Sequence, residues 1–216
     1  MEMDLILDKI KDIPYTSRRN LEIMLGEKRR TLDGRISSLI KRNIITRIKK
    51  GFYLINPYYE KEADKQSLME YLGCIVYSPS YVSLGYALSF YGIIPESIYK
   101  ITYVTSKKTR SIDFGFKGFI YKNIKGELFT GFETKNYKDK KIYFASKAKA
   151  LFDFLYFMSL KSNADAIGRY IISEARMNFG VMKSGDIKEF KRYVKLSGSK
   201  KMSMIESEIV KAVNES

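Results

Sequence analysis

The chain has 216 residues, long enough for one large domain or two small ones, and its 45% of hydrophobic residues can build a core. Its 39 Lys and Arg outnumber 24 Asp and Glu, and the net charge of +15 favours a polyanion as partner. The absence of histidine excludes a Ser–His–Asp triad and imidazole metal ligands, and no CxxC pair or glycine-rich phosphate loop occurs, so we expect no enzyme, no catalytic residue, no cofactor and no metal.

The N-terminus is acidic and lacks the basic region of a signal peptide. No segment approaches the ~20 continuous apolar residues that span a bilayer. We therefore expect a cytoplasmic protein without a membrane partner. The single cysteine, Cys74, stands among apolar residues and is expected to be a core thiol.

The spacing of apolar residues in the first fifty-odd positions predicts three helices. The first has Asp4 as its candidate N-cap and ends at Pro14. Thr16 or Ser17 can cap the second, which Gly26 closes. The third runs from about residue 28 to 42.

The third helix carries Leu32, Ile36 and Leu39 on one apolar face, and Asn43 follows it as a candidate left-handed residue. Residues 44–48 and 52–55 then predict two strands, and Gly51 between them can supply the positive φ of a short hairpin. Three helices followed by a basic hairpin predict a winged helix-turn-helix that binds double-stranded DNA.

The distribution of charge supports this prediction. Residues 18–50 hold 11 basic and 3 acidic side chains. The face of the third helix opposite Leu32 bears small residues between two cations, which would let its backbone sit deep in the major groove. Arg30 can contact guanine, and the lysines of the hairpin can reach phosphates. The predicted DNA-binding residues are Arg18, Arg19, Lys28, Arg29, Arg30, Thr31, Gly34, Ser37, Ser38, Lys41, Arg47, Lys49 and Lys50.

The remainder of the chain predicts an α+β domain, with a mostly antiparallel sheet and helices at its C-terminal end. Expected helices are 65–71, 81–92, 147–158, 165–177, 186–196 and 203–213; expected strands are 101–105, 118–124, 127–132 and 141–144. We place the domain boundary after Asn56, which gives a DNA-binding domain of residues 1–56 and a second domain of residues 57–216.

One pattern in the sequence is typical of an enzyme. Asp113, followed by Glu133 and Lys135, has the order of carboxylates and lysine found in metal-dependent nucleases. An ExK triplet arises easily when 29% of residues are charged, and an exposed strand face produces the same alternation. A nuclease therefore remains the unfavoured alternative.

Several segments of the second domain together resemble the AbiEi family, the antitoxins of abortive-infection toxin–antitoxin systems. The resemblance rests on residues 81–96, 101–105, 129–132 and 143–153, and on the Gly51-Phe52-Tyr53 end of the first domain. The family often has Pro and Glu where this chain has Lys147 and Ala148, so no role of that glutamate is carried over. Lys149 and Asp153 do match, and their i, i+4 spacing predicts an ion pair on the helix surface.

The resemblance implies an antitoxin that represses its own operon through operator repeats and counters a nucleotidyltransferase-like toxin. Whether such a toxin is bound directly stays open, and we expect a monomer in solution. A winged-helix transcription factor whose second domain senses a ligand is the other alternative.

Overall fold

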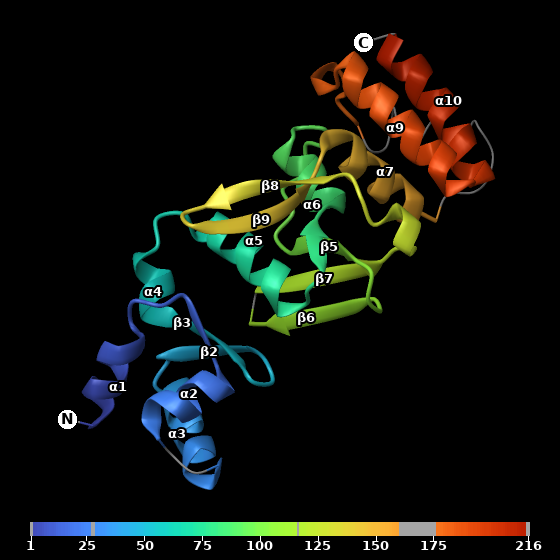
Figure 1. Ribbon diagram of the computed structural model, residues 1–216. Coiled ribbons are helices and arrows are strands. Elements are labelled where there is room, and N and C mark those ends of the chain that lie inside the picture. Colours follow the sequence, from blue (N-terminus) through green and yellow to red (C-terminus); the bar gives the residue numbers. More distant parts are fainter. Residues whose placement is uncertain (1, 27–28, 116, 160–175, 215–216) are drawn as a thin grey trace. The chain divides into compact units, whose positions relative to one another are not determined.

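A computed structural model describes residues 2–26, 29–115, 117–159 and 176–214 (Figure 1). The chain forms two compact units, one of residues 1–72 with 112–118 and the other of residues 73–111 with 119–216. Each is described separately below. Among the described residues, none of the helices combines the length and apolar character needed to cross a membrane.

The first unit combines helices with a small sheet. Its elements are α1 (Glu2–Ile10), β1 (Tyr15–Ser17), α2 (Arg18–Leu25), α3 (Arg29–Lys41), β2 (Ile45–Lys49), β3 (Phe52–Ile55), α4 (Asn56–Lys61) and the start of α5 (Lys65–Val76). The sheet has the order β1-β3-β2, with β3 antiparallel to both neighbours. Strand β1 is too short to show a period in the sequence, and we did not predict it.

The apolar face expected for the third helix is confirmed, because Leu32, Ile36 and Leu39 are all buried. They pack with apolar side chains from α1, α2, β2 and β3. That core comprises Ile6, Ile10, Leu21, Leu32, Ile36, Leu39, Ile45, Tyr53 and Ile55.

Most of the predicted helix ends are confirmed in the first unit. The Ser17 hydroxyl accepts a hydrogen bond of 3.0 Å from the Asn20 amide, and Gly26 ends α2 at φ 63°. Asn43 and Gly51 have φ values of 55° and 78°. The limits of the first helix are wrong: it already includes Asp4, which is therefore no cap, and it ends at Ile10, before Pro14.

The second unit is built on a mixed sheet. Its elements, with the end of α5, are β4 (Ser80–Val82), α6 (Leu84–Phe90), β5 (Ile101–Thr105), the start of β6 (Arg110–Phe114), most of β7 (Lys117–Asn123), η1 (Gly126–Leu128), β8 (Phe132–Tyr137), β9 (Lys140–Ala145), α7 (Lys147–Phe157), η3 (Phe179–Val181), α9 (Ser184–Ser197) and α10 (Lys200–Asn214). The strand order is β6-β7-β5-β4-β9-β8. The α+β class is confirmed. The sheet is more mixed than expected, because β4 pairs with β9 and β5 pairs with β7 in parallel.

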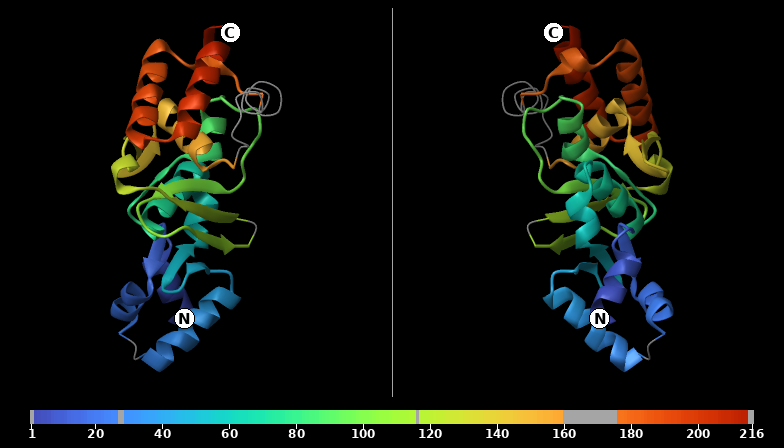
Figure 2. Two further views of the ribbon diagram at one scale, coloured as in Figure 1. Left: turned by 90° about the vertical axis from the view of Figure 1, so that its right-hand side faces the viewer. Right: turned by 90° about the vertical axis from the view of Figure 1, so that its left-hand side faces the viewer.

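Helices gather at one end of this sheet. Helix α9 packs against both α7 and α10, and the three lie side by side in the views of Figures 1 and 2. Lys201 of α10 donates hydrogen bonds to three carbonyl oxygens at the end of α7, those of Leu155, Tyr156 and Met158, at 3.2, 2.7 and 2.9 Å. The Leu155 oxygen also accepts from the Met158 amide, so Lys201 adds to the backbone bond that ends α7.

Two predictions for this region fail. The helix expected over residues 81–92 begins only at Leu84, because Tyr81 and Val82 pair with β5 as part of β4. Residues 127–132 are mostly a 3₁₀ turn and a loop, and the strand starts at Phe132. Strand β6 was not predicted. The helix expected over residues 165–177 lies almost wholly outside the described residues. Cys74 is buried, as expected.

Candidate nucleic-acid interface

Helix α3 presents a straight strip of exposed residues on the side opposite its buried face. Arg30, Gly34, Ser37 and Lys41 are exposed, whereas Leu32, Ile36 and Leu39 are not. Spacings of four, three and four residues align the strip along the helix axis. The small residues lie between the two cations, as the sequence predicted.

Gly34 has no structural reason to be glycine. A Cβ atom built at this position would meet no other atom within 4 Å. Glycine in a helix interior lowers stability by roughly 0.5–1 kcal/mol relative to alanine. An exposed helical glycine that packs against nothing in its own unit is instead suited to the close approach of another molecule.

Beside this strip, a cleft in the first unit brings together α2, α3 and the β2–β3 hairpin. Its lining residues are Arg18, Glu22, Asp33, Ile36, Ser37, Arg47, Lys50, Gly51 and Tyr53. Four of the predicted residues, Arg18, Ser37, Arg47 and Lys50, thus share one concavity. The other described members of the predicted set do not line it.

Arg18, a predicted DNA-binding residue at the start of α2, forms an ion pair within its own unit. Its guanidinium donates to the exposed carboxylate of Asp33 on α3, and this hydrogen bond raises the pKa of Arg18. The ion pair connects α2 to α3 and neutralises part of the charge of the cleft. The sequence does not predict this ion pair, because Arg18 and Asp33 are 15 positions apart and no local spacing rule brings them together.

The hairpin supplies the remaining cations of the cleft. Arg47 is exposed and lies 6.0 Å from the centre of the Tyr53 ring, and Lys50 at the turn is exposed. Lys49 is half-buried, with its ammonium 6.0 Å from the centre of the Phe52 ring. A β-bulge between Arg47 and Lys49 shifts the register there. Lys50 is therefore the better placed of the two predicted wing lysines to meet a ligand.

The rest of the predicted set is more scattered. Arg19 and Thr31 are exposed, and Ser38 is half-buried. The Ser37 hydroxyl donates to the Asp33 carbonyl oxygen at 2.8 Å, which leaves its lone pairs to accept from a ligand. Lys28 lies outside the described residues, and the side chain of Arg29 is not described.

The three residues of the nuclease pattern do not form a site. Asp113 lies on β6, whereas Glu133 and Lys135 lie on β8, at the opposite edge of the sheet. Four strands at about 4.8 Å spacing separate them, so the two carboxylates cannot share a metal ion. The Lys135 ammonium lies 5.0 Å from the centre of the Phe90 ring. Among the described residues, no cluster of three potential metal-binding side chains occurs.

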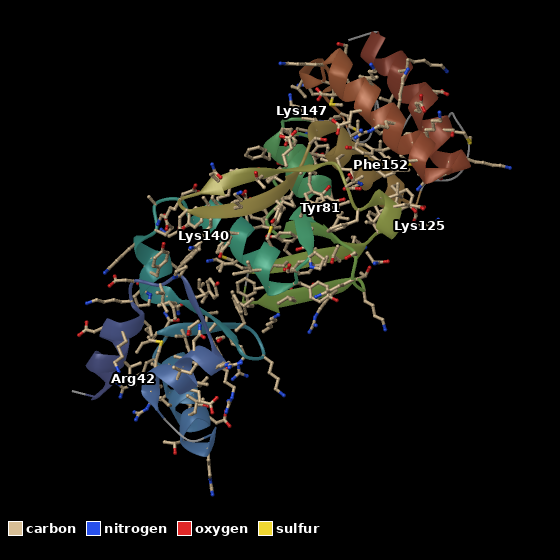
Figure 3. The ribbon with its side chains drawn as sticks, in the orientation of Figure 1. Arg42, Tyr81, Lys125, Lys140, Lys147 and Phe152 are labelled. Atoms are coloured by element: carbon tan, nitrogen blue, oxygen red, sulfur yellow. The ribbon has the colours of Figure 1, made fainter. Side chains whose placement is uncertain are left out.

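The pairing of Lys149 with Asp153 is confirmed, but its expected position on the helix surface is wrong. Both side chains are fully buried, and the ammonium lies 2.5 Å from the carboxylate. Asp153 also accepts hydrogen bonds from Tyr81 and Ser83, at 2.9 and 2.8 Å. Figure 3 labels Tyr81 of β4, a member of this cluster, and Phe152 of α7, whose ring centre lies 4.8 Å from the Lys149 ammonium.

The buried cluster joins segments that are far apart in the sequence. Tyr81 and Ser83 come from the first segment of the family resemblance, and Lys149 and Asp153 come from the last. The Tyr81 ring also stacks on Phe132, with centroids 4.6 Å apart, in a third such segment. Helical spacing alone could show that residues 149 and 153 meet, but not that β4 covers them.

No protein-family model matches the sequence, and a search of curated proteins finds no match.

Proposed function

We propose that the first unit is a winged helix-turn-helix that binds double-stranded DNA, with α3 in the major groove and the β2–β3 hairpin as the wing. The chain order of helix, strand, two helices and hairpin supports this assignment, as does the sheet order β1-β3-β2. The observation that carries it is the exposed strip on α3, with Gly34 open to solvent at its centre.

Gly34→Ala tests the DNA-binding proposal, because folding and binding should respond in opposite directions. The variant should raise the free energy of unfolding by about 0.5–1 kcal/mol, since alanine favours the helix. It should weaken binding to a duplex from the promoter of its own operon, because the added methyl group keeps the backbone away from the groove. Chemical denaturation and gel shifts measure the two effects on one preparation. Unchanged affinity would contradict the proposed docking of α3.

Two further substitutions separate sequence reading from backbone binding. Arg30→Ala should reduce the difference in affinity between the promoter duplex and a scrambled duplex. Replacing Lys49 and Lys50 with alanine should weaken binding to both duplexes and flatten the salt dependence, with a loss of about one unit of slope for each phosphate contact removed.

We further propose that the chain is an antitoxin and the autorepressor of its operon, and that its second unit counters a nucleotidyltransferase-like toxin. This proposal rests on the resemblance to the AbiEi family. It is supported by the buried cluster, in which Tyr81, Ser83, Lys149 and Asp153 from the separate matching segments are in mutual contact. The segments that resemble the family are therefore in contact in the fold, although they are far apart in the sequence.

Co-expression with the product of the adjacent gene tests the antitoxin proposal. The full chain should relieve the growth inhibition that this gene product causes alone. If the full chain gives no relief while it still binds its promoter, the antitoxin proposal fails, and a ligand-responsive winged-helix regulator becomes the better account.

A further inference from the structure

Asp33 is an acidic residue on the helix that is proposed to enter the major groove. Helix α3 carries four basic residues and this single acid. The Asp33 side chain is exposed, and spacings of three and four residues put it next to Arg30 and Ser37 on the helix surface. Asp33 and Ser37 both line the cleft of the first unit. The carboxylate therefore borders the exposed strip of α3, on the side of the cleft.

The usual structural roles of a helical carboxylate account poorly for Asp33. An acid in the first turn of a helix stabilises it through the helix dipole, but Asp33 lies after the first turn of α3. Its ion pair with Arg18 connects α3 to α2. The two side chains are 59% and 31% exposed, however, and ion pairs so open to solvent contribute little to stability. A carboxylate near a phosphate backbone also weakens DNA binding in general.

A carboxylate in the major groove can distinguish one base from another. Cytosine and adenine present an amino group there, at N4 and N6, whereas thymine and guanine present carbonyl oxygens at O4 and O6. A carboxylate accepts hydrogen bonds from the amino groups and repels the carbonyl oxygens. It offers about four acceptor sites, so the bond from Arg18 does not exhaust them. That bond also fixes the direction of the carboxylate, as a contact to a base edge requires.

We propose that Asp33, positioned by Arg18, is a specificity-determining residue that accepts a hydrogen bond from the exocyclic amino group of a cytosine or an adenine in the major groove. This inference deepens the proposed function and rests on the docking of α3 in that groove. Asp33 contributes to selectivity mainly by rejection, because at a thymine or a guanine its charge faces a carbonyl oxygen and stays without a donor from the base.

Selection from a library of duplexes with randomised positions tests this role. At one position the full chain should enrich cytosine or adenine about tenfold over thymine and guanine, as expected for a good contact to a base edge. The enriched base identifies which amino group is bound. Asp33→Ala should lose the preference at that position and keep the others. If this variant keeps every preference, or loses one for thymine or guanine, the inference is wrong.

Glu22→Ala is the matched control for the loss of charge. Glu22 is an exposed acid that lines the same cleft, but it belongs to α2 rather than to the helix proposed to enter the groove. Both substitutions remove one negative charge, so both should strengthen binding to scrambled duplexes. Only Asp33→Ala should change a base preference. Identical preferences of the two variants would contradict a direct contact between Asp33 and a base.

Charge reversal at the same position supplies a second variant. A lysine donates to O6 and N7 of guanine, so Asp33→Lys should favour guanine where the unaltered chain favours cytosine or adenine. Partial unfolding cannot imitate this change, because it lowers the affinity for all duplexes by one factor, whereas a base preference is a ratio measured on a single preparation. Retention of the original preference by the lysine variant would overturn the proposal.

A gel shift with the promoter duplex separates failure of this inference from failure of the proposed function. If the unaltered chain enriches no sequence and does not bind the promoter duplex, the DNA-binding function fails and the role of Asp33 fails with it. If the chain binds the promoter duplex but the Asp33 variants keep all of its base preferences, DNA binding stands and the role of Asp33 alone fails.

Discussion

Lys149 and Asp153 face each other 2.5 Å apart in α7, and neither side chain has any exposed surface. Burial lowers the pKa of Lys149, although Asp153 opposes the shift, and burial raises the pKa of Asp153 against the pull of Lys149. Each charge therefore depends on its partner, because a buried charge without one is strongly unfavourable.

This dependence predicts a marked departure from additivity. Lys149→Met and Asp153→Asn should each lower the free energy of unfolding by about 3–5 kcal/mol, because each leaves one buried charge alone. The double variant should cost much less than the sum, since Asn can still accept from Tyr81 or Ser83. Urea denaturation of the four proteins measures the coupling. Additive losses would show that the pair is not coupled.

Gly131 predicts a second stability effect in the same region. It has a φ of 78°, and a Cβ atom there would overlap the Tyr193 hydroxyl and approach Cδ of Lys149 to 3.1 Å. Gly131→Ala should therefore cost about 2–5 kcal/mol from backbone strain and overpacking. Gly126→Ala is the control, because a Cβ atom there meets nothing within 4 Å. Thermal or chemical denaturation that gives equal stabilities for the two variants would contradict the close packing at Gly131.

Lys201 predicts how strongly α10 stabilises α7. Lys201→Met keeps the apolar stem but removes the three hydrogen bonds to the end of α7, so it should cost about 1–3 kcal/mol. Lys200→Met, at an exposed neighbouring position, should change little. Hydrogen exchange at the last turn of α7 should accelerate only in the Lys201 variant; identical exchange in both would exclude this capping role.

Two tyrosines predict how stability changes at alkaline pH. Burial raises the pKa of Tyr91 and of Tyr193 to about 12, whereas a tyrosine in the unfolded chain titrates near pH 10. Their contribution to stability is therefore complete below about pH 10 and is lost as the pH rises toward about 12.

Denaturation at several pH values checks this expectation. Tyr91→Phe should make the decline in stability over this range shallower, and Tyr99→Phe, at a side chain that is 92% exposed, should leave it unchanged. An unchanged decline in the Tyr91 variant would show that this phenol ionises alike in both states.

The elements of the first unit are predicted from the sequence better than those of the second, because the patterns that mark them lie within a few consecutive residues. The face of α3 repeats every three or four residues, and Ser17, Gly26 and Asn43 mark helix ends through their own chemistry. The ion pair of Arg18 with Asp33 joins two helices, and no local rule could reveal it.

In the second unit the failures have a common physical cause. Tyr81 and Val82 fit a helix by their spacing, but hydrogen bonds to β5, a distant strand, make them part of β4. Strand β8 is an edge strand with the polar sequence FETKNY, so it lacks the alternation of apolar residues that marks a half-buried strand. The burial of Lys149 and Asp153 likewise depends on residues some 70 positions earlier.

The hydrogen bonds of Lys201 also have a consequence for the newly made chain. On the ribosome, α7 is synthesised well before the lysine that caps it, since 46 positions separate Lys201 from Leu155. Until that lysine emerges, the carbonyl oxygens of Tyr156 and Met158 lack this donor and must bond to water or to a transient partner. We therefore expect chains that stall in this interval to be the forms that chaperones hold and proteases remove.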